Sequence, residues 1–182
     1  MAGGQKRTLF GMPPARAAAT VGVLCALAVA LSFLERLLTA AVPLPPGAKL
    51  GLANVCVTFA VSALGFFPAL VVALFRSFFV FLTAGGLSAV MSLSGGLCSL
   101  AVTALLARLV KKEKISWFSV SILSACAHNV GQLAAACVVG SAAPGLLLTG
   151  LMLLFGLAFG SLTGVVLNTL VPALSGLRAD SR

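Results

Sequence analysis

Residues 66–110 read FFPALVVALFRSFFVFLTAGGLSAVMSLSGGLCSLAVTALLARLV, and they indicate the fold class of the chain. Only two residues of this stretch are charged. A helix crosses the hydrocarbon of a membrane in about 20 apolar residues, so the stretch can cross twice. Gly85-Gly86 stands near its middle and is expected to break it. We therefore expect one membrane span from Pro68 to Thr83 and another from Leu87 to Val110.

The composition of the whole chain agrees with a membrane protein. Of its 182 residues, 60% are hydrophobic and 8% are charged, whereas a soluble domain carries about 25% charged residues. This excludes a water-soluble domain and a disordered chain. The apolar runs are continuous rather than alternating, which favours helices over an outer-membrane barrel. The net charge of +9 comes from short basic clusters between apolar runs, a pattern that orients helices and does not indicate nucleic-acid binding.

Outward from the central stretch, the same criterion predicts further spans at residues 17–34, 50–66, 117–139 and 146–170. The first should end at Glu35-Arg36, and the proline-rich residues 42–47 should form a loop. Pro68 should restart the chain after the second span, and the last span should stop near Pro172. The fold class is therefore an all-α, polytopic bundle of six transmembrane helices. The expected transmembrane domain spans residues 17–170, and cytoplasmic tails are expected before it at 1–16 and after it at 171–182.

The distribution of basic residues orients this bundle. With six spans, nine bases fall on one side of the membrane. They are Lys6, Arg7, Arg16, Arg108, Lys111, Lys112, Lys114, Arg178 and Arg182. Only Arg36 and Lys49 fall on the other side, in the first loop. By the positive-inside rule both termini are expected in the cytoplasm, with the chain in the cell membrane and lipids around it.

Arg76 is an ionisable residue near the middle of a predicted span, about 12 Å along the helix from Pro68. Such a residue is costly in a bilayer and usually faces the bundle interior. It is either a cation that faces an anionic ligand group or a buried carboxylate, or a structural arginine that binds backbone carbonyls. Glu35 is the acid expected nearest to it.

Three polar residues in the fifth predicted span also indicate a site. His128 and Gln132 are four residues apart and share a helix face, and Asn129 lies beside them. They form either a ligand or ion pocket or a set of interhelical hydrogen bonds. A metal site is the weaker interpretation, because this single histidine has no cysteine or carboxylate at ligand spacing. Asn54 is expected near the outer end of its span.

Small residues suggest close helix packing. Gly156, Gly160 and Gly164 form two overlapping GxxxG steps, and Ala26 and Ala30 form a similar step on the first span. Such faces serve a contact within the chain or with a partner subunit. Three serines of the fourth span are expected to bond to their own helix: Ser92, Ser94 and Ser99.

Several chemistries lack their sequence signature. There is no P-loop, no G-x-S-x-G and no H-E-x-x-H, and three acids are too few for a carboxylate-held magnesium site. The five cysteines show no C-x-x-C spacing and suggest no disulfide framework. We therefore expect no catalytic residues, no metal and no cofactor, and a binding or transport subunit rather than an independent enzyme.

Several blocks of sequence resemble a known family. They are ALAVALSFLE at 26–35, PLPPGAKLGLAN at 43–54, GGLSA at 85–89, SLSGG at 92–96 and AHNVGQ at 127–132. They resemble the Gx transporter family, which is also labelled heptaprenyl diphosphate synthase component I. Its pattern is similar to the substrate-binding S components of energy-coupling factor (ECF) transporters.

The resemblance implies a role for several of these positions. S components have six helices, cytoplasmic termini, and a ligand pocket toward the outer face beneath the first loop. Ala26 and Ala30 would dock onto a transmembrane coupling subunit that works with separate ATPases, and residues 43–47 would form a lid. The pocket would be lined by Lys49, Asn54, Arg76, His128, Asn129 and Gln132.

Three functions remain open from the sequence. The first is a capture subunit of an importer, which binds a small molecule from outside. The second is an accessory membrane protein of polyprenyl diphosphate or menaquinone metabolism, including quinone-linked electron transfer, with an isoprenoid ligand. The third is a membrane scaffold without a ligand.

Overall fold

The computed structural model describes residues 13–41, 51–110, 112–139 and 146–179, and these are helical apart from short connections. The helices are α1 (Pro14–Ala41), α2 (Asn54–Ala63), α3 (Phe66–Val110), α4 (Trp117–Val139) and α5 (Leu146–Ala179). Within the described residues four helices, α1, α3, α4 and α5, are long and apolar enough to cross a membrane. The chain is thus an all-helical protein of membrane type.

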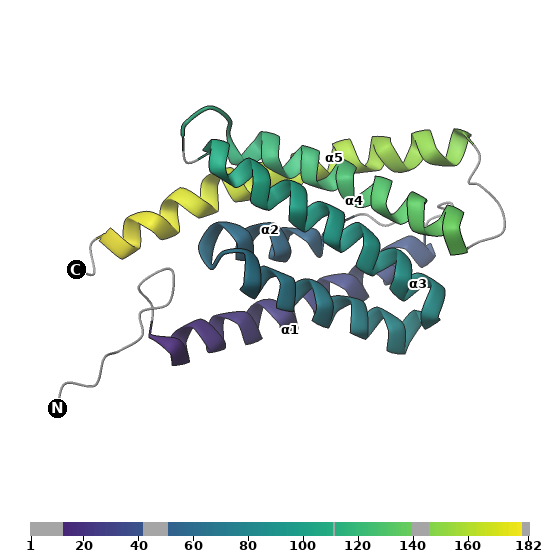
Figure 1. Cartoon of the computed structure of the whole chain (residues 1–182), viewed down its shortest axis with the longest axis horizontal. Coiled ribbons are helices and arrows are strands. Elements are labelled where there is room, and N and C mark those ends of the chain that lie inside the picture. Colours follow the sequence, from purple (N-terminus) through teal and green to yellow (C-terminus); the bar gives the residue numbers. More distant parts are fainter. Residues whose placement is uncertain (1–12, 42–50, 111, 140–145, 180–182) are drawn as a thin grey trace.

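α3 is a helix of 45 residues that is interrupted at Gly85. Unbroken, it would extend about 68 Å, roughly twice the hydrocarbon thickness of a bilayer. Gly85 has φ 82° and ψ 176°, a conformation that glycine adopts without steric cost. The chain reverses there, so that two arms of α3 run antiparallel (Figure 1). This confirms the predicted break, with arms at 66–84 and 86–110.

α2 is shorter than the predicted span at 50–66. It holds 10 residues, about 15 Å, which is half the thickness of the hydrocarbon. Gly51 and Gly65 have positive φ and stand on either side of it. The break after α2 therefore occurs at Gly65, and the prediction of a restart at Pro68 is wrong. Pro68 lies in the first turn of α3, where its missing N–H needs no partner.

Two other predicted helix ends also differ. α1 continues past Glu35 to Ala41, and α5 continues past Pro172 to Ala179. The first prediction treated a charged pair as an end signal, although Glu35 is buried and has partners inside the bundle. The second treated a proline as a stop, although a helix can continue through a proline when it forgoes one backbone hydrogen bond.

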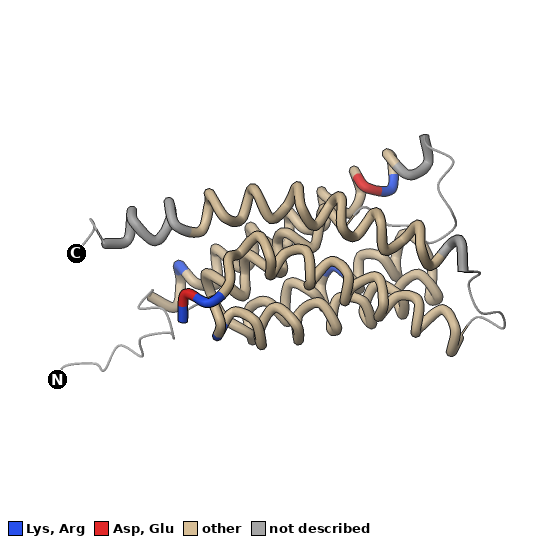
Figure 2. The backbone as a smooth tube through the Cα atoms, turned by 90° about the horizontal axis from the view of Figure 1, so that it is seen from above, with Lys and Arg blue, Asp and Glu red and all other residues tan. Residues whose placement is uncertain are grey.

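The helices form a bundle in which both ends of the chain lie together. α1 begins and α5 ends at the same end of the bundle, near the turn between α3 and α4 (Figure 1). The reversal at Gly85 and the start of α5 lie at the opposite end. Figure 2 shows acidic and basic residues mostly toward the two ends, with little charge along the middle.

Two kinds of contact hold the bundle together. α1, α2 and the first arm of α3 share an apolar cluster that includes Leu24, Ala28, Val57 and Val72. α4 packs against α3 on one side and α5 on the other, through glycines and hydroxyl side chains. The outer surface carries large exposed apolar residues, such as Phe67 at 72% and Val138 at 86% exposure, as expected of a protein surrounded by lipid.

Candidate functional site

The short α2 helix determines where polar side chains can gather. It occupies the half of the bundle toward the chain ends and begins at Asn54, near mid-length (Figure 1). The other half contains the reversal of α3, the start of α5 and parts of α1 and α4, and α2 does not enter it (Figure 1). We call this half the distal half. The buried charges of Glu35 and Arg76 and the buried amide of Gln132 belong to it.

Glu35 and Arg76 form a buried ion pair between α1 and α3. Glu35 is 3% and Arg76 is 2% exposed. Arg76 Nη2 lies 3.9 Å from Glu35 Oε2, and Arg76 Nε donates a hydrogen bond to Ser32 Oγ at 3.2 Å. Glu35 Oε1 accepts a hydrogen bond from the backbone N–H of Gly51. Glu35 thus connects α1 to Arg76 of α3 and to the backbone that leads into α2.

A second cluster, at mid-length, consists of hydroxyls around Asn54. Ser99 Oγ donates to Asn54 Oδ1 at 2.8 Å, and Asn54 Nδ2 donates to Ser124 Oγ at 3.3 Å. Thr103 Oγ1 donates to Ser124 Oγ at 2.8 Å, and Ser99 and Ser124 are 2.7 Å apart. All four side chains are buried. The cluster joins α2, α3 and α4, and each of its four side chains has a hydrogen-bond partner within it.

The prediction that the three serines of this segment bond to their own helix is wrong, because Ser92 Oγ has no partner among the described residues and the other two bond to neighbouring helices. Ser99 bonds to α2 and α4, and Ser94 Oγ donates to the backbone oxygen of Gly131 in α4 at 2.8 Å. Hydroxyls turn outward from a helix when a neighbouring helix comes close enough to offer an acceptor. Asn54 is likewise buried, at 5% exposure.

His128 and Gln132 form a third cluster, on the face of α4 toward α3. Gln132 Nε2 lies 2.8 Å from His128 Nε2. An amide nitrogen can only donate, so the imidazole accepts there and is neutral. Gly95 makes room for both side chains, because a Cβ at Gly95 would lie 2.7 Å from Gln132 Cγ and 3.0 Å from His128 Cε1.

Ser92 lies at the same level of the bundle as Gln132. The contacts Ser99–Ser124 and Ser94–Gly131 fix the antiparallel register of the second arm of α3 against α4, and this register places Ser92 opposite Gln132. Both side chains are at most 1% exposed. Ser92 Oγ and Gln132 Oε1 have no hydrogen-bond partner among the described residues.

Arg76 approaches this level from the first arm of α3. Gly96 faces Ala73 across the hairpin, because a Cβ added at Gly96 would lie 3.9 Å from the Ala73 Cβ. One helical turn from this contact toward Gly85, the first arm has Arg76 and the second arm has Ser92, so these two residues lie at the same level of the bundle. Among the described residues, the distal half therefore contains one buried cation, one buried carboxylate and two buried oxygens that lack a partner. We call Ser92, His128 and Gln132 the Gln132 site.

Asn129 and the glycines of α5 lie on a different face. Asn129 Nδ2 donates to the backbone oxygen of Met152 in α5, and an added Cβ at Gly156 would lie 2.7 Å from that nitrogen. A Cβ at Gly160 would lie 3.0 Å from Ile122 Cα, and one at Gly164 would lie 2.9 Å from the Phe118 ring. The structure thus places these residues at the contact between α4 and α5.

Two further residues predicted from the sequence lie apart from these clusters. Ala26 and Ala30 are exposed on α1, and a Cβ added at the neighbouring Gly22 would meet nothing within 4 Å. Lys49 and the loop at 43–47 lie outside the described residues. Three buried residues of these clusters were not predicted from the sequence: Ser32, Ser124 and Thr103. The one signal that they carry in the sequence is a hydroxyl within an apolar run.

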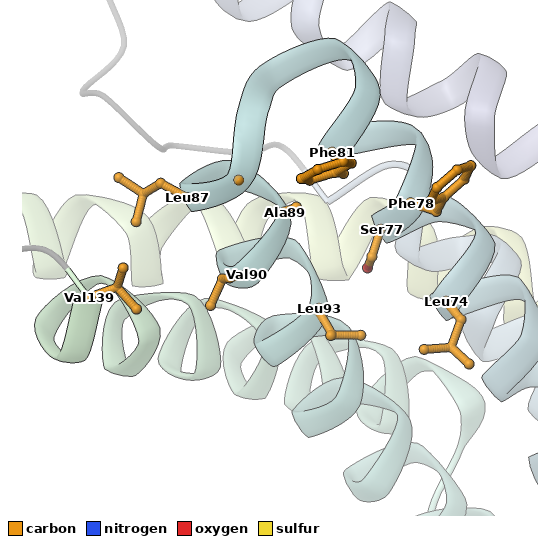
Figure 3. Close-up of a pocket in the computed structure, with 10 residues that line it drawn as sticks. Leu74, Ser77, Phe78, Phe81, Leu87, Ala89, Val90, Leu93 and Val139 are labelled. Atoms are coloured by element: carbon orange, nitrogen blue, oxygen red, sulfur yellow. The ribbon is translucent and has the colours of Figure 1, made fainter.

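An apolar pocket of about 360 Å³ lies beside the hairpin of α3 (Figure 3). Both arms of α3 and the end of α4 line it. Its lining residues are Leu74, Ser77, Phe78, Phe81, Gly86, Leu87, Ala89, Val90, Leu93 and Val139. Phe78 and Phe81 are more than half exposed, so the pocket opens toward the lipid side of the bundle.

Within the part of the chain that the structure describes, no three His, Cys, Asp or Glu side chains gather as a metal site would require. All five cysteines lie there as free thiols. The buried polar side chains described in the distal half offer hydrogen bonding and charge pairing.

Comparison with known proteins identifies the family. No curated protein and no solved structure matches the chain. The family model described as heptaprenyl diphosphate synthase component I matches residues 24–170. This range contains every residue of the ion pair, the Asn54 cluster and the Gln132 site, and it agrees with the resemblance seen in the sequence. The chain belongs to the heptaprenyl diphosphate synthase component I family of membrane proteins.

Proposed function

We propose that this protein is the substrate-binding subunit of a membrane importer, similar to the S component of an ECF transporter. It captures a small molecule from the outer face, and separate ATPase chains drive release to the cytoplasm. The observation that carries the proposal is the pair of buried, unpartnered oxygens of Ser92 and Gln132. A polar group buried without a partner costs about 1–3 kcal/mol, a cost that a bound molecule removes.

The orientation of the bundle supports capture from outside. In this proposal the two arms of α3 cross separately and α2 with its flanking residues makes another crossing, which gives six passes. Arg16, Arg108, Lys112 and Lys114 then belong to the cytoplasmic side, in agreement with the positive-inside rule. The distal half, with the Gln132 site, then faces outward.

The exposed face of α1 supports a partner in the membrane. Ala26 and Ala30 point away from the chain's own core, and large apolar residues such as Val23 and Leu27 flank them at 66% and 47% exposure. Small residues let another helix approach closely. We assign this face to a coupling subunit that also binds the ATPases, because the sequence contains no P-loop.

Affinity purification from native membranes tests the proposal. We expect ATPase chains and a transmembrane coupling chain to co-purify, and Ala26→Trp to remove them without loss of the folded protein. Leu154→Trp is the matched control, since Leu154 is also an exposed apolar position, on α5 (61% exposed). A stable chain that recovers neither partner nor small molecule would contradict the proposal.

A second function is favoured by the apolar pocket beside α3. Its size and its opening toward lipid suit part of an isoprenoid chain, and the family description names heptaprenyl diphosphate synthesis. In this alternative the protein is an accessory component of polyprenyl or menaquinone metabolism. Deletion of the gene would then shorten polyprenyl chains or lower menaquinone, whereas unchanged lipids with loss of nutrient uptake would exclude it.

A further inference from the structure

The Gln132 site contains acceptors that lack donors. Gln132 Oε1 can only accept a hydrogen bond, and Ser92 Oγ can accept or donate one. Both atoms are buried, at 0% and 1% residue exposure, and neither has a partner among the described residues. The two oxygens therefore lack at least one hydrogen-bond donor, which is an N–H or O–H group.

His128 fixes the direction in which the Gln132 amide presents its oxygen. The 2.8 Å contact between Gln132 Nε2 and His128 Nε2 occupies one donor hydrogen of the amide. With the amide nitrogen in this contact, the amide oxygen lies on the other side of the group and has no partner among the described residues. The oxygen consequently stays available as an acceptor.

The two buried charges that the structure describes near the site compensate each other. Arg76 and Glu35 are 3.9 Å apart and both are buried, and the imidazole of His128 is neutral in its contact with Gln132. An anionic molecule at this level would leave one negative charge without compensation in a low-dielectric interior, which is strongly unfavourable. A molecule without net charge leaves the ion pair intact.

We propose that the small molecule held at the Gln132 site has no net charge and donates a hydrogen bond to Gln132 Oε1, as an amide, a hydroxyl or a ring N–H does. This inference rests on the proposed function, and it specifies the substrate class of the same site. It replaces the idea that Arg76 receives an anionic group of the ligand. Arg76 instead keeps Glu35 in place, and the carboxylate holds the backbone of Gly51.

A matched pair of fluorinated probes tests the inference. Trifluoroacetamide and trifluoroacetate share the same CF₃ group and nearly the same shape. The first is neutral and donates N–H, whereas the second is an anion without a donor. Both are small enough to enter a site built for a larger molecule. The measurement is ¹⁹F line broadening of each probe with the full chain in lipid nanodiscs.

We expect broadening of trifluoroacetamide that falls about fivefold to tenfold in Gln132→Met, as the loss of one hydrogen bond predicts. Ser92→Ala is the second variant, because it removes one oxygen and is the milder change to the fold. Ser161→Ala is the control, since the Ser161 hydroxyl bonds to the backbone of its own helix. The control should leave the broadening unchanged.

Three results would overturn the inference. They are stronger broadening of trifluoroacetate, equal broadening in wild type and in both Gln132→Met and Ser92→Ala, and no broadening of either probe. A different experiment decides the proposed function, which fails when affinity purification from native membranes yields neither partner chains nor a retained molecule. A retained molecule that is anionic at neutral pH would overturn the inference and leave the proposed function standing.

Discussion

Glu35→Gln and Arg76→Gln should each destabilise the protein severely, whereas the double variant should recover most of the loss. Two unit charges 3.9 Å apart attract each other by about 4 kcal/mol at an effective dielectric constant of 20. Removal of one partner of a buried pair costs about 3–5 kcal/mol, because the other charge stays buried alone. Removal of both leaves neutral amides. Glutamine at position 35 also keeps an oxygen for the Gly51 N–H.

Equilibrium unfolding in detergent with increasing SDS measures these differences, and Trp117, the one tryptophan of the chain, reports the transition. Lys112→Gln is the control, because Lys112 is exposed near the end of the bundle and its loss should change the free energy of unfolding by less than about 0.5 kcal/mol. The reasoning is refuted when both single variants unfold like wild type, or when the two losses simply add in the double variant.

Three further predictions concern packing, hydrogen bonding and the partner face. Gly160→Val should lower the free energy of unfolding by about 1–3 kcal/mol, because a Cβ added at this position would lie only 3.0 Å from the backbone of Ile122. An unchanged SDS midpoint would contradict this. Asn54→Ala should cost about 1–3 kcal/mol in the same assay, since it removes the buried hydrogen bonds to Ser99 and Ser124, whereas Ser161→Ala should cost less than about 0.5 kcal/mol. Ala26→Trp should leave stability within about 0.5 kcal/mol of wild type, because Ala26 is exposed; a large loss would mean that this face packs within the chain.

Much of the helix pattern could be predicted from local sequence. The apolar run at 66–110 exceeds twice the length of a span, and a glycine pair marks where it reverses. α4 begins and ends where expected, because a basic cluster precedes it and apolar residues fill it. The length of α2 could not be predicted, because hydropathy does not report that Gly51 and Gly65 adopt positive φ.

The site could be predicted only in part, because most of its contacts join residues that are far apart in the sequence. His128 and Gln132 share a face by their spacing alone, and their ring and amide nitrogens lie 2.8 Å apart. The pairing of Glu35 with Arg76, and of Ser99 with Ser124, depends on how whole helices rotate and slide against each other. Sequence identified Arg76 as unusual and Glu35 as the acid expected nearest to it, and the structure places the two 3.9 Å apart. From this pair we infer a ligand without net charge, where the sequence had left an anionic ligand group open.

Native mass spectrometry of the chain in nanodiscs tests most directly whether the distal half is a binding site. The account predicts one small molecule per wild-type chain, without net charge, and at least a tenfold lower occupancy in Ser92→Ala/Gln132→Met. Ser161→Ala should retain it as wild type does. A wild-type chain that carries only lipid, or a molecule that the double variant retains equally, would contradict the account.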